Sequence, residues 1–455
     1  GWFELLATGV SAGAEYCFVL SDGMTIPDPA SRGQKGEVNG TSLVIDPTNY
    51  EWQNAAWKGR PWEEAVVYEF HVGTFTQEGT FRAAIEKLPH LAELGITAVE
   101  IMPVAQFAGN RGWGYDGVLL YAPHSAYGTP EDMKAFIDAA HGHGLMVLLD
   151  VVYNHFGPDG NYLPLVAPSF FHPEKHTPWG AAIAYETDAV RRFFIENALY
   201  WLEEYQIDGL RFDAIDQIGD DGSEKHILVE IAERIRSELP DRHIHLTTED
   251  ARNITSLHER DADGGVPRFT AEWNDDLHNA IHVYATGETD GYYKDFADKT
   301  EYLVARTLAE GFAYQGEMSK QSGEARGVTS TGQPPLHGRG IRRAPPLPVL
   351  YRLPRRTRQG CARRTTKGIR RSCRPWTRGR GNPGSQCRDH LHRLQARLGE
   401  TRGRRGCRVD GTDESASHAS PRDHRSDDPH RARIRRHDPG SGGWPGRSPL
   451  ELPRR

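Results

Sequence analysis

Two carboxylic acids end two apolar segments of this sequence and could act together on one bond. Asp213 follows the run GLRF at residues 209–212, and Glu249 follows the run HIHLTT at residues 243–248. In a parallel barrel, the C-terminal ends of buried strands bring reactive groups to one face. One acid could attack a sugar there as nucleophile while the other serves as general acid/base, as in a retaining glycoside hydrolase. Either acid alone would more often be a surface or helix-capping residue.

The elements that would position these acids alternate between short apolar runs and helical patterns. Six buried strands are predicted at residues 65–72, 96–104, 145–155, 209–213, 243–249 and 268–273. Helices are predicted at 81–94, 130–143 (starting at Thr129 or Pro130), 187–205, 227–239 and 300–312, with a long loop at 111–128. This alternation indicates an α/β fold of the (β/α)8 or TIM-barrel type. Such a barrel needs eight strands, but the pattern stops at about residue 330, so the predicted barrel is incomplete.

The first 50 residues have a different pattern, with short strands predicted in 2–9, 14–23 and 41–47. Asp22-Gly23, followed by residues 24–26, predicts a hairpin turn. We therefore divide the chain into the remainder of an N-terminal β domain (1–50), a barrel (51–332) and a tail (333–455).

The tail differs from the rest of the chain in charge. It holds 31 of the 55 Lys and Arg residues but only 10 of the 62 Asp and Glu residues, whereas residues 1–332 hold 24 and 52. Its Arg, Pro, Gly, Ser and His mixture has too few apolar residues to cover a core. A disordered nucleic-acid-binding tail is one explanation. We favour out-of-frame translation of a GC-rich gene, because the tail begins where a seventh strand is due and would leave a sheet edge open.

Cysteine usage and hydropathy exclude several classes of protein. Four of the five cysteines lie in the tail without a CxxC spacing, which argues against a zinc module, and Cys17 alone cannot make a disulfide framework. The sequence has no membrane-spanning apolar run. Its start, GWFELLATGV, lacks Met and a basic segment, so we expect a truncated start, no signal peptide and a cytoplasmic protein.

Three segments resemble, in order, signature segments of the α-amylase family of glycoside hydrolases: DVVYNH (150–155), GLRFDAIDQ (209–217) and TTEDARN (247–253). PDPASRGQ (27–34), GWGYDG (112–117) and AEWNDDLHNAIH (271–282) look like the trehalohydrolases of that family. The resemblance covers nearly all of residues 1–330. It implies an N-terminal β-sandwich, here cut short, before the barrel, and cleavage of a trehalose-capped α-1,4-glucan at the bond next to the trehalose. The implied partner is an oligosaccharide, without cofactor, metal, membrane or nucleic acid.

The resemblance also assigns roles to individual residues. Asp213 becomes the nucleophile and Glu249 the general acid/base, while Asp150 is a structural carboxylate. Arg211 lies two residues before Asp213, on the same strand face, and should hydrogen-bond its carboxylate and favour the charged form. The implied substrate-binding residues are Tyr115, His155, Arg211, Asp216, Trp273 and Asp275. Trp113 is a less specific candidate, and Asn154, which resembles a calcium-site position, receives no metal.

Two departures from the family pattern bear on activity. Asp216 stands where many relatives have a histidine or lysine that holds sugar hydroxyls. An Asn-His-Asp segment, which supplies a third essential carboxylate, is absent, and Arg436-His437-Asp438 lies in the wrong context. We therefore predict that the chain as written is severely impaired or inactive. Alternative functions are glycogen branching or debranching within the same family, and a non-catalytic fusion with a basic nucleic-acid-binding tail.

Overall fold

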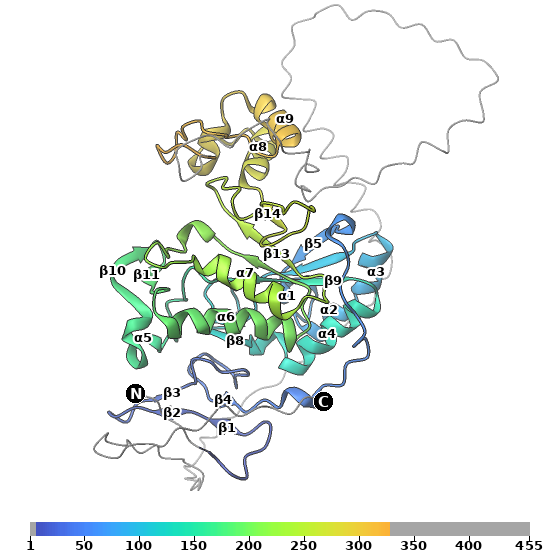
Figure 1. The fold of residues 1–455 in the computed structure, drawn as a ribbon. Helices are drawn as coiled ribbons and strands as arrows, with labels where there is room; N and C mark the ends of the chain where they lie inside the picture. The colour runs from blue at the N-terminus through green and yellow to red at the C-terminus, as the bar shows by residue number, and fades with distance from the viewer. Residues whose placement is uncertain (1–5, 328–455) are drawn as a thin grey trace, which may run out of the picture. The chain divides into compact units, whose positions relative to one another are not determined.

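A computed structural model describes residues 6–327 of the chain (Figure 1). Six parallel strands form one sheet and pair in chain order. They are β5 (Val67–Phe70), β6 (Ala98–Ile101), β9 (Met146–Val151), β12 (Gly209–Phe212), β13 (His245–Glu249) and β14 (Ala271–Trp273). The described part of the chain is thus an incomplete (β/α)8 barrel, which confirms the predicted fold class and all six strands.

Helices follow these strands along the chain, with α8 and α9 after the last strand, β14. The longer ones are α4 (Pro130–Gly142), α6 (Asp188–Glu203), α7 (Ile227–Glu238), α8 (Asp275–Thr286) and α9 (Thr300–Glu310). The shorter ones are α1 (Val72–Phe75), α2 (Phe81–Ile85), α3 (Leu88–Glu93) and α5 (Leu163–Val166). Thr129 caps α4 with a capping box to Asp132, which confirms the predicted helix start.

The central strands are buried along their whole length, because helices and loops cover both faces of a parallel sheet. Every residue of β6, β9 and β12 is buried, including the charged residues Glu100, Asp150 and Arg211. Buried charges are costly unless they are paired. These three residues therefore indicate where a functional site lies.

Two sequence predictions about the local structure of residues 81–128 are wrong. The helix predicted at residues 81–94 is split into α2 and α3, because Pro89 lacks an N–H and its ring would clash with the carbonyl of Ile85, where α2 ends. The loop predicted at residues 111–128 contains the strand β8 (Leu119–Pro123), which pairs antiparallel with β7 (Ala105–Gln106). The apolar run of β8 was assigned to the loop because a glycine-rich turn precedes it.

The N-terminal segment contains two small antiparallel pairs. They join β1 (Glu15–Tyr16) to β4 (Ser42–Leu43) and β2 (Phe18–Val19) to β3 (Thr25–Ile26). Gly23 has a φ of +89° between β2 and β3, so the predicted hairpin turn is present. The strand predicted at 2–9 does not form in residues 6–9, where Leu6 is exposed, and residues 1–5 lie outside the described part.

Other elements were not predicted. They include α5, α8 and an antiparallel hairpin of β10 (Phe171–Thr177) and β11 (Gly180–Ile183). Short 3-10 helices occur at Pro47–Asn49, Trp62–Glu64, Ser125–Tyr127, Pro168–Phe170, Ile215–Gln217 and Gly291–Phe296. The tail at residues 333–455 lies outside the described residues. The position at which a seventh strand was expected lies outside them as well.

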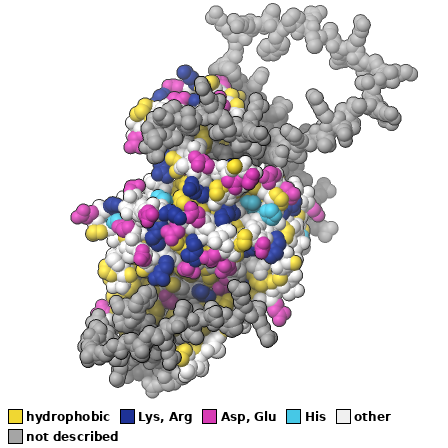
Figure 2. Space-filling model, in the orientation of Figure 1, with side chains coloured by type: hydrophobic (Ala, Val, Ile, Leu, Met, Phe, Trp, Pro, Cys, Tyr) yellow, Lys and Arg dark blue, Asp and Glu magenta, His cyan; other side chains and the backbone are white. Residues whose placement is uncertain are grey.

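The surface visible in Figure 2 mixes acidic and basic side chains over the described residues. Among residues 6–327, no helix is long and apolar enough to cross a membrane.

Candidate active site

Arg211 on β12 joins the carboxylates of neighbouring strands. Its Nη1 donates hydrogen bonds to Asp150 Oδ2 on β9, at 2.5 Å, and to Asp213 Oδ1, at 3.0 Å. Asp150 and Arg211 are direct partners in the parallel register, so the pairing of the two strands sets this contact. The hydrogen bond expected from Arg211 to Asp213 is present.

Four carboxylates surround this one guanidinium. Glu249 Oε2 lies 3.8 Å from Nη2 of Arg211, and Glu100 Oε1 lies 4.0 Å from Nε. Burial raises the pKa of Glu100 to about 8 and that of Asp150 to about 7, although Arg211 opposes both shifts. Because one positive charge cannot compensate four negative ones, the site favours protonation of part of this cluster at neutral pH.

Both oxygens of Asp213 are held by donors. Arg211 donates to Oδ1, and Nδ2 of Asn154 donates to Oδ2 at 3.0 Å and to the Asp213 backbone carbonyl at 2.8 Å. Oδ1 of Asn154 contacts Nδ1 of His155, which orients the amide so that its Nδ2 faces Asp213. A carboxylate that accepts hydrogen bonds on both oxygens is fixed in orientation. This role of Asn154 was not predicted from the sequence, although its place near the end of DVVYNH was a usable signal.

Glu249 has a different environment. Burial raises its pKa to about 7, with a further contribution from the charge of Asp275, while Arg211 opposes the shift. Its Oε2 accepts a hydrogen bond of 2.8 Å from the N–H of Ala214, the residue after Asp213. Ala214 has a φ of +41°, an uncommon conformation for a non-glycine residue. The strained residue therefore connects the two candidate catalytic acids.

Tyr115 lies beside the same cluster. Its hydroxyl donates to Asp150 Oδ2 at 3.0 Å, so the loop that carries it is attached to β9. The preceding Gly114 has a φ of +98°, and a Cβ there would lie 2.0 Å from the carbonyl oxygen of Pro103. Only glycine fits this turn of the GWGYDG segment.

His155 is buried at the end of the DVVYNH segment. Burial lowers its pKa, against the charges of Asp213 and Asp116, so the imidazole is neutral at neutral pH. The ring of Trp179, in the β10–β11 hairpin, stacks on it with centroids 4.6 Å apart and 22° between the planes. Trp179 remains 48% exposed, so one part of its surface is free to meet solvent or a ligand. The sequence analysis missed Trp179, which no strand-end pattern marks.

Trp273 and Asp275 come from the next strand and the helix after it. Trp273 is the register partner of Glu249, and its ring centre lies 5.8 Å from the guanidinium carbon of Arg211. Asp275 is the first residue of α8, after the N-cap Asn274. Burial raises the pKa of Asp275. The structure thus brings both residues to the carboxylate cluster.

Two other predicted residues make different contacts. Asp216 accepts a hydrogen bond of 2.6 Å from Nε2 of Gln217, within the 3-10 helix that follows Asp213. Trp113 is 74% exposed in its loop. Among residues 6–327, no group of three or more His, Cys, Asp or Glu side chains could hold a metal ion.

In comparisons with known proteins, a family model and several relatives match this chain. A family model described as alpha amylase, catalytic domain, matches residues 66–179. The chain is 47% identical over 315 residues to malto-oligosyltrehalose trehalohydrolase of Deinococcus radiodurans, covering 69% of this chain and 51% of the relative. It is 41% identical over 322 residues to the protein of that name from Saccharolobus solfataricus, covering 70% of this chain and 56% of the relative.

A solved structure also matches. It belongs to a Salmonella typhimurium protein provisionally named alpha amylase, with 71% identity and a TM-score of 0.70. The match covers 72% of this chain and 56% of that one. This chain therefore spans about half the length of the curated relatives it matches.

Proposed function

Because this chain belongs to the α-amylase family of glycoside hydrolases, we propose that it is the catalytic part of a retaining trehalohydrolase. Its substrate is a trehalose-capped α-1,4-glucan, and it cleaves the bond next to the terminal trehalose. The observation that carries the proposal is the contrast between two acids at neighbouring strand ends. Asp213 accepts hydrogen bonds on both oxygens, whereas Glu249 has its pKa raised to about 7.

The reaction has two steps. Glu249 protonates the oxygen of the leaving sugar while Asp213 attacks the anomeric carbon, which forms a glycosyl ester and breaks the glycosidic bond. Water then attacks the same carbon, Glu249 takes its proton, and the Asp213 carboxylate is released. The pair should be about 5 to 5.5 Å apart for this retaining route.

The surrounding side chains suit a sugar at the cleavage site. The neutral imidazole of His155 offers a hydrogen-bonding group without adding a charge, and the ring of Tyr115 can meet the C–H face of glucose. Trp179, stacked on His155 and half-exposed, offers a second aromatic face beside them.

Product analysis tests the proposal. The purified protein is incubated in excess over maltooligosyltrehalose, so that even one turnover is visible, and Asp213→Asn serves as the control. Free trehalose that disappears with Asp213→Asn supports the proposal. New α-1,6 branches from a linear glucan would instead indicate a branching enzyme, and linear chains released from a branched glucan a debranching enzyme.

A further inference from the structure

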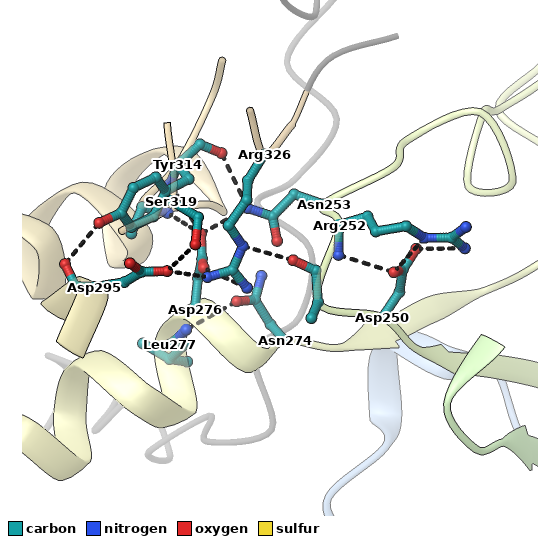
Figure 3. Close-up of polar contacts among 12 residues, drawn as sticks. Asp250, Arg252, Asn253, Asn274, Asp276, Leu277, Asp295, Tyr314, Ser319 and Arg326 are labelled. Atoms are coloured by element: carbon teal, nitrogen blue, oxygen red, sulfur yellow. Dashed lines mark hydrogen bonds and ion pairs between the residues drawn. The ribbon is translucent and has the colours of Figure 1, made fainter. Parts of the chain in front are cut away.

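Arg326 is buried between the loop that follows β13 and the side chains of Asp276 and Asp295 (Figure 3). Its Nε donates to the carbonyl oxygen of Ala251 at 2.6 Å. Its Nη2 lies 3.4 Å from Asp276 Oδ1 and its Nη1 3.6 Å from Asp295 Oδ2. The guanidinium also faces the ring of Tyr314, with its carbon 5.4 Å from the ring centre. Such desolvated contacts make the side chain a fixed, oriented charge.

The loop that Arg326 holds leaves β13 directly after Glu249. The backbone carbonyl of Arg252 in this loop accepts a hydrogen bond from the N–H of Gly327 at 2.8 Å. Nδ2 of Asn253 donates to Asp276 Oδ2 at 2.7 Å and to the carbonyl of Tyr314 at 3.0 Å (Figure 3). Asn253 has a φ of +59°, so this loop is held in an uncommon backbone conformation by its partners. The position of the chain just beyond Glu249 thus depends on these attachments.

At the start of α8, Asp276 pairs with Arg326, and the preceding Asp275 is affected by the charge of Arg326. Asp276 is hydrogen-bonded by the N–H groups of Ala313 and Tyr314, at 2.8 and 2.9 Å. Burial raises the pKa of Asp275, and Arg326 is the strongest charge that opposes this shift. Asp275 is in turn the strongest charge that raises the pKa of Glu249. Arg326 is therefore connected to Glu249 both through the loop and through Asp275.

We propose that Arg326 is a positioning residue for the general acid/base Glu249, because it holds the loop after Glu249 and supplies the positive charge that pairs with Asp276, beside Asp275. This inference rests on the proposed function only for the role given to Glu249. The charged and titratable groups around Glu249 and Asp275 are Arg211, Asp213, Asp250, Glu272, Asp276, His278 and Arg326.

The direction of the effect follows from the coupling between the two acids. Arg326 favours the charged form of Asp275, and the charge of Asp275 raises the pKa of Glu249. Without Arg326, the charged form of Asp275 is less favoured, so its charge acts less on Glu249. The pKa of Glu249 then falls.

Carbon-13 NMR titration of the side-chain carboxyl groups tests this in the full chain without any turnover. The Glu249→Gln variant assigns the signal of Glu249. We expect Arg326→Gln to lower the titration midpoint of Glu249 by about half a pH unit or more. Arg326→Lys keeps the positive charge, so its midpoint should stay close to that of the unsubstituted protein. Arg306→Gln is the matched control, because Arg306 donates a hydrogen bond of 2.9 Å to the carbonyl of Ala313, whose N–H binds Asp276. This variant should leave the midpoint of Glu249 unchanged.

An unchanged midpoint in folded Arg326→Gln would overturn the inference, as would an equal shift in Arg306→Gln. If Arg326→Gln does not fold, Asp275→Asn is measured instead, alone and together with Arg326→Lys. The single change should lower the midpoint of Glu249, and its failure to do so overturns the inference. If the Arg326 shift is present but a version of the protein with its reading frame restored releases no trehalose, the proposed function alone is contradicted.

Discussion

Asp213 and Glu249 are the same kind of group in two different environments. Asp213 accepts hydrogen bonds from Arg211 and Asn154, whereas Glu249 is partly buried, is affected by the charge of Asp275 and accepts one hydrogen bond from a backbone N–H. A nucleophile must be ionised and oriented, and a general acid must hold its proton near the working pH. At the scale of residues, we therefore expect the two acids to be separable by experiment.

Glu249→Gln should lower the hydrolysis of maltooligosyltrehalose by about 10²- to 10⁴-fold, because the leaving sugar oxygen loses its proton donor. Formation of the glycosyl ester from α-maltosyl fluoride should persist, since fluoride leaves without protonation. Pre-steady-state fluoride release measures this step, and Asp213→Asn should abolish it. Equal loss on both substrates in Glu249→Gln would contradict the role of Glu249 as the acid.

The raised pKa of Glu249 predicts the alkaline side of the pH profile. The acid works only when protonated, so kcat/KM for the oligosaccharide should fall as the pH rises through about 7. The fluoride-release step, which needs no proton donor, should lack this fall. A profile for the oligosaccharide that stays flat to pH 9 would show that Glu249 is not the group that must be protonated.

At the scale of elements, strand register and turns place the site. The parallel pairing of β9 with β12 puts Asp150 beside Arg211, and the pairing of β13 with β14 puts Glu249 beside Trp273. A slip by one residue would turn these side chains to the other face of the sheet. Tyr115 instead depends on a loop, whose path depends on Gly114.

Gly114→Ala should therefore destabilise the protein, by about 2 to 4 kcal/mol in the free energy of unfolding, because the added Cβ meets a backbone oxygen. Gly109→Ala is the control, since Gly109 also has a positive φ of +75° but has open space around a Cβ. That variant should lose only about 1 kcal/mol, from backbone strain. Urea denaturation measures both variants, and equal losses would show that the contact with Pro103 carries no cost.

At the scale of the whole molecule, the described residues supply six parallel strands of a barrel type that closes with eight. The two acids and Arg211 come from strands within this set. The third carboxylate of the family, an Asn-His-Asp segment, has no match in the sequence. The chain as written is thus expected to carry Asp213 and Glu249 without the third carboxylate, which would hydrogen-bond the sugar ring at the cleavage site.

Trehalose release should accordingly be at least about 100-fold slower than by a version whose reading frame is restored, because the missing hydrogen bonds are worth several kcal/mol in the transition state. Sequencing the gene across codons 325–345 and reading all frames downstream shows whether an Asn-His-Asp segment exists. Equal rates from both versions would contradict the prediction. Nucleic-acid binding that weakens steeply with salt, and is lost on removal of residues 335–455, would instead support a basic tail with its own function.

The sequence by itself determined the parts of this protein that depend on neighbours along the chain. Apolar runs and helical spacing predicted the six strands and the order of the helices, and the strand ends marked Asp213 and Glu249. The split at Pro89 was also readable from the sequence, although the prediction overlooked it.

Only the tertiary structure decided the features that depend on distances through space. The pKa of Glu249 is set by burial and by Asp275, 26 positions along the chain, and the loop after Glu249 is held by Arg326, 77 positions along. Trp179 stacks on His155 from the β10–β11 hairpin, which no sequence periodicity predicted. Local patterns predict which elements form. The electrostatic field and the contacts at a site, however, come from residues that are brought together only when the chain folds.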